Sequence, residues 1–139
     1  MPEATALRHI LIVEDNPTDV QLIAEALSAH GVVHELVVLE DGDKALRHFS
    51  VSENAKPDLI ILDLHMPKHD GLEVLASYRQ TVRLGAVPIV VLTSSDSPSE
   101  RRRAETIGVS AFLQKPMTLD AFMAIGKRLK ALLEVPPLA

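Results

Sequence analysis

Short runs of apolar residues alternate along the chain with longer stretches of mixed character. Each run is continuous, which is typical of strands that are buried on both faces of a parallel sheet. The five runs occupy residues 10–13, 36–39, 59–62, 89–92 and the weaker 111–113. The regular alternation therefore predicts five buried strands that are connected by helices.

The stretches between the runs have helical spacing. An apolar stripe with the spacing i, i+3, i+4, i+7 starts at Val20, and a second stripe runs from Leu119 to Leu129. This spacing places the apolar side chains on one face of a helix. Shorter and more polar helices are predicted over residues 42–50, 71–80 and 98–107.

Capping residues mark the helix starts. Asn16 precedes a proline, which is favoured at the first helical position. Ser97 and Glu100 have the spacing of a capping box, in which Glu100 would return to the N–H of Ser97. The other three starts are marked by Asp41, Asp70-Gly71 and Thr118. Five helices between and after five strands predict an α/β fold, a doubly wound five-stranded parallel sheet with helices on both faces.

Length and composition narrow the class of protein. With 139 residues, we expect one domain over 1–139, with a core of about 8–131 and loosely held ends. The chain has no cysteine, which excludes a disulfide framework, a thiolate metal site and a cysteine nucleophile.

The net charge and the short apolar runs exclude two classes of partner, nucleic acids and membranes. There are 14 basic and 19 acidic residues, giving a net charge of −5, whereas a nucleic-acid surface needs a basic face. No apolar run approaches the roughly 18–20 residues of a membrane span, and the first residues do not resemble a signal peptide. We therefore expect a cytoplasmic protein that binds neither nucleic acid nor a membrane.

The candidate chemistry lies directly after the apolar runs. In open parallel sheets, ligands bind beyond the carboxyl ends of the strands. The residues at those ends are Glu14, Asp15, Asp63, Thr93 and Lys115. Neighbouring carboxylates repel one another, and a divalent cation relieves that repulsion. Oxygen ligands of this kind favour Mg²⁺, or Mn²⁺ in its place, over zinc.

Other kinds of phosphate chemistry are excluded by missing motifs. The chain has neither a Gly-x-Gly-x-x-Gly loop nor a Walker lysine loop. His65 stands where the dehalogenase-like phosphatases carry a second aspartate. The loop after the first strand is acidic, so it would repel the phosphate of a flavin.

Taken together, the polar residues carry a family resemblance. The chain resembles the receiver domain of two-component response regulators over residues 8–131, and the resemblance implies the flavodoxin-like strand order 2-1-3-4-5. The intervals of 30 residues from Asp63 to Thr93 and of 22 from Thr93 to Lys115 are usual in that family. The matching elements are Glu14-Asp15, Asp63-Leu64-His65-Met66-Pro67, Asp70-Gly71, Thr93 and Lys115-Pro116.

The resemblance implies a role for each of these residues. Asp63 would accept a phosphoryl group from a sensor histidine kinase and form an aspartyl phosphate. Asp15 and Asp63 would ligate Mg²⁺ together with the backbone carbonyl of His65, and Glu14 would act through metal-bound water. Such a protein is a signalling phosphoacceptor rather than an enzyme.

Three further features follow from the same resemblance. Thr93 would donate a hydrogen bond to the phosphoryl group, and Lys115 would pair with its charge. A cis peptide bond between Lys115 and Pro116 would direct the lysine into the site. Phe112 matches an aromatic switch position, where the ring turns inward once Thr93 has moved towards the phosphoryl group.

Each residue also has a simpler interpretation. Asp63 could be a turn former, and Asp15 could cap the following helix. Thr93 could merely end a strand, Lys115 could be a solvated loop charge, and Phe112 could be ordinary core. The sequence alone leaves these alternatives open.

The partners depend on a finer resemblance. Segments 34–37, 41–42 and 66–68 resemble stand-alone receivers that are paired with phytochrome-type histidine kinases. Two functions remain open. One is a phosphorylation switch whose surface, within residues 88–133 around Phe112, binds a target protein or forms a homodimer. The other is a phosphate carrier or sink without a downstream target.

Overall fold

The described part of the chain forms one parallel sheet. The computed structural model describes residues 6–51, 56–66, 68, 70–81 and 86–134. The strands are β1 (Arg8–Val13), β2 (His34–Leu39), β3 (Leu59–Leu62), β4 (Ile89–Thr93) and β5 (Ala111–Gln114). Their order across the sheet is β2-β1-β3-β4-β5, which confirms both the predicted sheet and the implied strand order.

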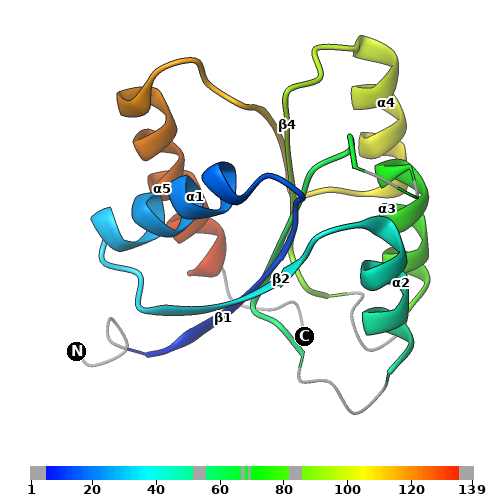
Figure 1. Cartoon of the computed structure of the whole chain (residues 1–139), viewed down its shortest axis with the longest axis horizontal. Coiled ribbons are helices and arrows are strands. Elements are labelled where there is room, and N and C mark those ends of the chain that lie inside the picture. Colours follow the sequence, from blue (N-terminus) through cyan, green and yellow to red (C-terminus); the bar gives the residue numbers. More distant parts are fainter. Residues whose placement is uncertain (1–5, 52–55, 67, 69, 82–85, 135–139) are drawn as a thin grey trace.

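Helices cover both faces of this sheet. α1 and α5 lie on one side, and α2, α3 and α4 lie on the other (Figure 1). The bounds are α1 (Pro17–Ala29), α2 (Gly42–Ser50), α3 (Gly71–Gln80), α4 (Pro98–Ile107) and α5 (Leu119–Leu133). The three shorter helices agree with the predicted ranges. Among the described residues, no helix has the length and apolar character needed to span a bilayer.

The core is divided by the sheet into two layers. Successive side chains of a strand point to opposite faces, so Leu11 and Val13 of β1 pack towards α2, α3 and α4. Ile10 and Ile12 of the same strand pack towards α1 and α5. Both layers are apolar, which explains why the strand sequences are continuously apolar rather than alternating.

Differences from the predicted elements occur at their ends. β1 and β2 each begin two residues earlier than predicted, with polar residues that the apolar pattern could not detect. Leu119 is 60% exposed, although the predicted stripe of α5 included it. It is the first residue of the helix, whereas the buried residues Phe122, Ile125 and Leu129 come later.

The predicted helix caps are present at all five helices. The side chains of Asn16, Asp41, Asp70, Ser97 and Thr118 each accept a hydrogen bond from a backbone N–H in the first turn. The reciprocal half of the predicted capping box is different. The N–H of Ser97 donates to Ser95 Oγ at 3.2 Å, and the Glu100 carboxylate is directed elsewhere.

Candidate functional site

Strand register brings the first acidic residues together. Val13 is opposite both Leu39 and Leu62, so β1 and its two neighbours end at the same level. The ladder continues past the strands, because the N–H of Asp63 donates to the carbonyl of Val13 at 3.0 Å. Glu14 and Asp63 therefore emerge side by side at the carboxyl edge of the sheet.

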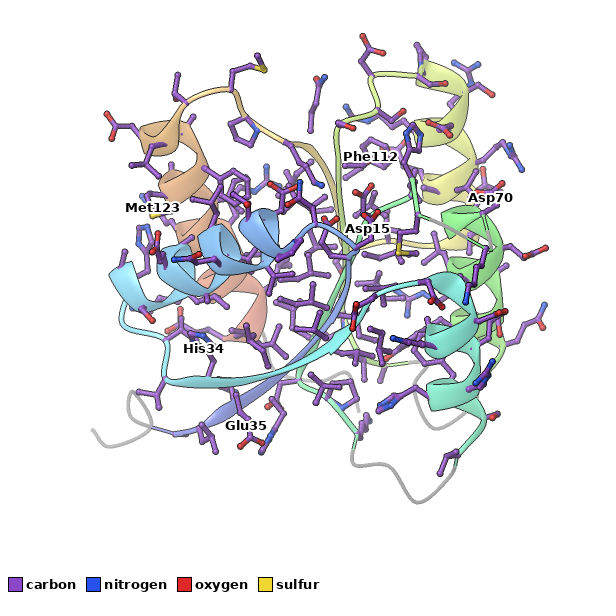
Figure 2. All side chains as sticks on the ribbon, in the orientation of Figure 1. Asp15, His34, Glu35, Asp70, Phe112 and Met123 are labelled. Carbon is purple, nitrogen blue, oxygen red and sulfur yellow. The ribbon has the colours of Figure 1, made fainter. Side chains whose placement is uncertain are left out.

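Three carboxylates meet at this edge. One oxygen from each of Glu14, Asp15 and Asp63 lies within 4.8 Å of the other two. Glu14 and Asp63 are only 2% and 4% exposed, while Asp15 is exposed. Figure 2 shows Asp15 where β1 turns into α1, at the opposite end of the sheet from Glu35. The structure thus brings together the acidic residues that the sequence singled out.

The acidic pair is not used to cap α1. Asn16 Oδ1 accepts the N–H of Thr18 at 2.9 Å and that of Asp19 at 3.4 Å. Glu14 accepts the N–H of Asn16 at 3.2 Å, which orients the Glu14 carboxylate. The simpler interpretation of Asp15 as a helix cap is therefore wrong, because the next residue does that work.

Lys115 lies among three carboxylates. Its Nζ is 2.8 Å from Glu14 Oε1, 2.9 Å from Asp63 Oδ2 and 2.6 Å from Asp19 Oδ2. The Lys115 side chain is only 13% exposed, so it is not a solvated loop charge. Asp19 was not among the site residues predicted from the sequence. A signal was available, because Asp19 lies one helical turn beyond Asp15.

The backbone positions Lys115 without the cis bond that the resemblance implied. No cis peptide bond occurs in the described residues, so Lys115 and Pro116 are joined in trans and that expectation is wrong. The N–H of Lys115 donates to the carbonyl of Thr93 at 2.8 Å, extending the β4–β5 ladder past Gln114. This contact holds Lys115 at the end of β5, from which its side chain reaches the acidic residues.

Burial and charge shift two pKa values in the site. Burial raises the pKa of Glu14 to about 7, the charge of Asp63 adds to the rise, and Lys115 opposes it. Burial alone would lower the pKa of Lys115, but its hydrogen bonds to Asp19, Glu14 and Asp63 raise it above the ordinary value. The lysine therefore stays charged at neutral pH.

The loops after β3 and β4 complete the surroundings of Asp63. The N–H of His65 donates to Asp63 Oδ1 at 3.0 Å, while Asp63 Oδ2 is held by Lys115. Thr93 ends β4 and is fully buried, and its Oγ1 accepts the N–H of Ser95 at 3.3 Å. Both oxygens of the Asp63 carboxylate are thus fixed in orientation.

Phe112 lies at the border between core and surface. It is partly buried and packs against the core layer on the side of α2, α3 and α4. The Arg101 guanidinium of α4 lies over the ring, 5.6 Å from its centroid (Phe112 is labelled in Figure 2). Phe112 is therefore neither a fully buried core residue nor an isolated surface residue.

The donor set fits a divalent cation. Glu14, Asp15 and Asp63 offer only carboxylate oxygens, the ligands that Mg²⁺ and Mn²⁺ prefer. Asp19 adds a fourth carboxylate, and three of the four contact the ammonium of Lys115, which leaves surplus negative charge in a partly buried site. A divalent cation compensates such a surplus.

Comparison with known proteins identifies the family. The model of the response regulator receiver domain matches residues 10–126. The chain is a response regulator receiver domain. Phosphorylation of an aspartate by a histidine kinase is the general role of this family, which confirms the predicted phosphoacceptor function at that level.

Several relatives of this receiver domain span most of its length. Response regulator Rcp1 from Synechocystis sp. (strain ATCC 27184 / PCC 6803 / Kazusa) is 37% identical over 128 residues, covering 88% of this chain and 87% of Rcp1. The probable methanogenesis regulatory protein FilR2 from Methanothrix harundinacea (strain 6Ac) is 39% identical over 114 residues, covering 80% of this chain and 74% of FilR2.

Solved structures agree with the fold and with metal binding. The phosphorylated cyanobacterial phytochrome response regulator RcpA has a TM-score of 0.86 and 32% identity, covering 96% of this receiver domain and all of RcpA. The Mn²⁺-bound form of Rcp1 has a TM-score of 0.83 and 33% identity, covering 95% and 99% of the two chains. A divalent metal in a relative supports the same cofactor class for the acidic group of this receiver domain.

Proposed function

We propose that Asp63 is the phosphoacceptor of this receiver domain, in a Mg²⁺-dependent transfer from a histidine kinase. The observation that carries the proposal is the setting of the Asp63 carboxylate. It is 4% exposed, held on one oxygen by the N–H of His65 and on the other by Lys115, and adjacent to Glu14 and Asp15. A turn former would need neither the buried lysine nor the acidic neighbours.

In the transfer step, an Asp63 oxygen forms a bond to phosphorus while the P–N bond of the kinase phosphohistidine breaks. The electron pair stays on the leaving nitrogen, and the imidazole departs neutral because its other nitrogen carries a proton. Catalysis of phosphoryl transfer is mainly positioning and charge neutralisation. Lys115 supplies a fixed positive charge beside Asp63 Oδ2, and Thr93 supplies a hydroxyl donor for a phosphoryl oxygen.

Three side chains and one carbonyl are proposed to hold the cation. Asp15 and Asp63 would ligate it directly, Glu14 would act through water, and the carbonyl of His65 would supply a further oxygen. When bound, Mg²⁺ neutralises negative charge on the phosphoryl oxygens. Lys115 contacts both Glu14 and Asp63, so its ammonium also compensates the charge of these two carboxylates.

A phytochrome-type histidine kinase is the proposed partner. Support comes from RcpA, a phytochrome response regulator, which aligns along 96% of this chain. The proposed output is a change in the surface within residues 88–133. Phe112 lies in that surface under Arg101, and its strand pairs with the strand that ends in Thr93.

The first experiment is phosphorylation by acetyl phosphate in Mg²⁺, followed by intact mass measurement. The wild-type chain should gain one phosphoryl group, and EDTA should prevent the gain. Asp63→Asn should gain none. Asp70→Asn is the matched control, because it also removes a carboxylate close in sequence and asparagine still caps α3. Wild-type protein that gains no phosphoryl group from several donors would contradict the proposal.

A further inference from the structure

A carboxylate bridge joins two loops beside the proposed phosphorylation site. Glu100, in the first turn of α4, accepts a hydrogen bond from Ser95 Oγ. The same carboxylate lies 3.2 and 3.3 Å, measured from its two oxygens, from His65 Nε2. Ser95 follows β4 and His65 follows β3, so Glu100 connects the loops of neighbouring strands.

Each end of this bridge is tied to a residue of the site. The N–H of His65 donates to Asp63 Oδ1 at 3.0 Å, and the N–H of Ser95 donates to Thr93 Oγ1 at 3.3 Å. The position of Glu100 is therefore transmitted through two short paths, one to Asp63 and one to Thr93. A shift in either loop would alter the surroundings of the phosphoryl group.

The bridge is not needed to start α4. Ser97 Oγ accepts the N–H of Glu100 at 3.2 Å, and the N–H of Ser97 is satisfied by Ser95 Oγ. The capping box predicted from the sequence would have directed the Glu100 carboxylate back to Ser97. Because the cap is complete without it, that carboxylate is free to bind Ser95 and His65.

We propose that Glu100 is a positioning residue that prolongs the lifetime of the aspartyl phosphate by holding the His65 and Ser95 loops together. This inference rests on the proposed phosphorylation of Asp63. In hydrolysis, a water oxygen bonds to phosphorus while the P–O bond to Asp63 breaks. The electron pair stays on the Asp63 carboxylate, and the proton of water passes to the released phosphate or the solvent.

The location of the bridge explains the proposed effect. In-line attack brings the water from the side opposite the Asp63 oxygen, which is the solvent side beyond the strand ends. His65 and Ser95 lie at that end of the sheet, because their N–H groups donate to Asp63 Oδ1 and to Thr93 Oγ1. Glu100 fixes them to each other, so it restricts the entry of water. Without the bridge, the loops separate more easily and hydrolysis becomes faster.

The test is to phosphorylate the full chain with acetyl phosphate, remove the donor and follow the loss of phosphoryl mass with time. Glu100→Ala should still gain one phosphoryl group but lose it about three to ten times faster than wild type, the range for one or two lost hydrogen bonds. Glu100→Gln should restore most of the lifetime, because its amide can accept from Ser95 and donate to the ring of His65.

Two controls separate this effect from a general disturbance. Glu105→Ala also removes an acid of α4, whose contact is with Arg101 and not with the two loops, so its lifetime should match wild type. Adding Ser95→Ala to Glu100→Ala should shorten the lifetime little further, because the bridge is already lost and only the contact of Ser95 Oγ with the N–H of Ser97 is removed in addition. Thermal unfolding of each variant verifies that it is folded.

The possible outcomes distinguish a failure of the role of Glu100 from a failure of the proposed function. Equal or longer lifetimes in Glu100→Ala, with normal phosphorylation, would overturn the role of Glu100 and leave the proposed function intact. A short lifetime in Glu100→Gln as well would also overturn it, because the hydrogen bonds would then not be what matters. If wild type gains no phosphoryl group, the proposed function fails, and this inference fails with it.

Discussion

The helices α4 and α5 flank the sheet on opposite faces, yet they are attached to it very differently. α5 buries Phe122, Ile125, Gly126, Leu129 and Leu133. α4 buries only Ala104, and its three consecutive arginines are exposed. α5 is therefore part of the fixed framework, whereas α4 buries little apolar surface and also makes a polar contact through Glu100 and a cation–π contact through Arg101.

The packing of α5 leaves no room for adjustment. A methyl group added at Gly126 would lie 2.2 Å from the carbonyl oxygen of Ala26 in α1. By contrast, α4 is connected to the site through Glu100 and to β5 through Arg101 and Phe112. From this difference we expect that the proposed phosphorylation of Asp63 displaces α4 at a lower cost than α5, whose displacement would disturb the core.

The largest expected effect is on α5. Leu129 is fully buried, so Leu129→Ala should lower the free energy of unfolding by about 2–5 kcal/mol in urea titrations. Ile107→Ala in α4 is the matched truncation, and Ile107 is only partly buried. Its cost should be below about 2 kcal/mol, because less apolar surface returns to water. Similar costs for the two variants would break the contrast between the helices.

The fold was largely predictable because its determinants are local in sequence. Runs such as 59–62 are buried on both faces, and cap residues such as Asp41 act on the next helical turn, so each leaves a direct pattern. The first two residues of β1 and of β2 were not predicted, because they pair through the backbone without contributing apolar side chains.

The site was predictable only in part. Glu14, Asp63 and Lys115 each follow an apolar run, so their convergence can be inferred from a parallel sheet. Asp19 and Glu100 lie within helices, and their contacts with Lys115 and with Ser95 depend on how α1 and α4 are oriented against the sheet. Such contacts between distant elements follow from tertiary packing, which spacing alone does not encode.

A smaller effect should appear at the outer edge of α4. Arg101→Ala removes the guanidinium over Phe112 and the ion pair with Glu105, at a cost of about 0.5–1 kcal/mol. Hydrogen exchange should become faster in α4 and stay unchanged in α5. Arg102→Ala, an exposed neighbour, is the control and should change stability by less than about 0.5 kcal/mol. Faster exchange in α5 would show that the two helices are not independent.

The smallest effect concerns the charge of Glu100. The hydroxyl of Ser95, and then the ring of His65, hold the pKa of the Glu100 carboxyl below its usual 4.5. A carboxyl whose pKa is lower in the folded chain stabilises the fold above the unfolded pKa, and this stabilisation is lost as the pH falls through the folded pKa. Wild type should therefore be slightly more stable than Glu100→Gln at neutral pH, and urea titrations at about pH 3 should show a smaller difference.

In a Ser95→Ala background the pH dependence of this stability difference should shrink, because the main cause of the pKa shift of Glu100 is gone. If the stability advantage of wild type over Glu100→Gln instead grows on acidification, the ionised carboxylate destabilises the start of α4. That outcome would contradict a stabilising polar contact at Glu100 and with it this part of the contrast with α5.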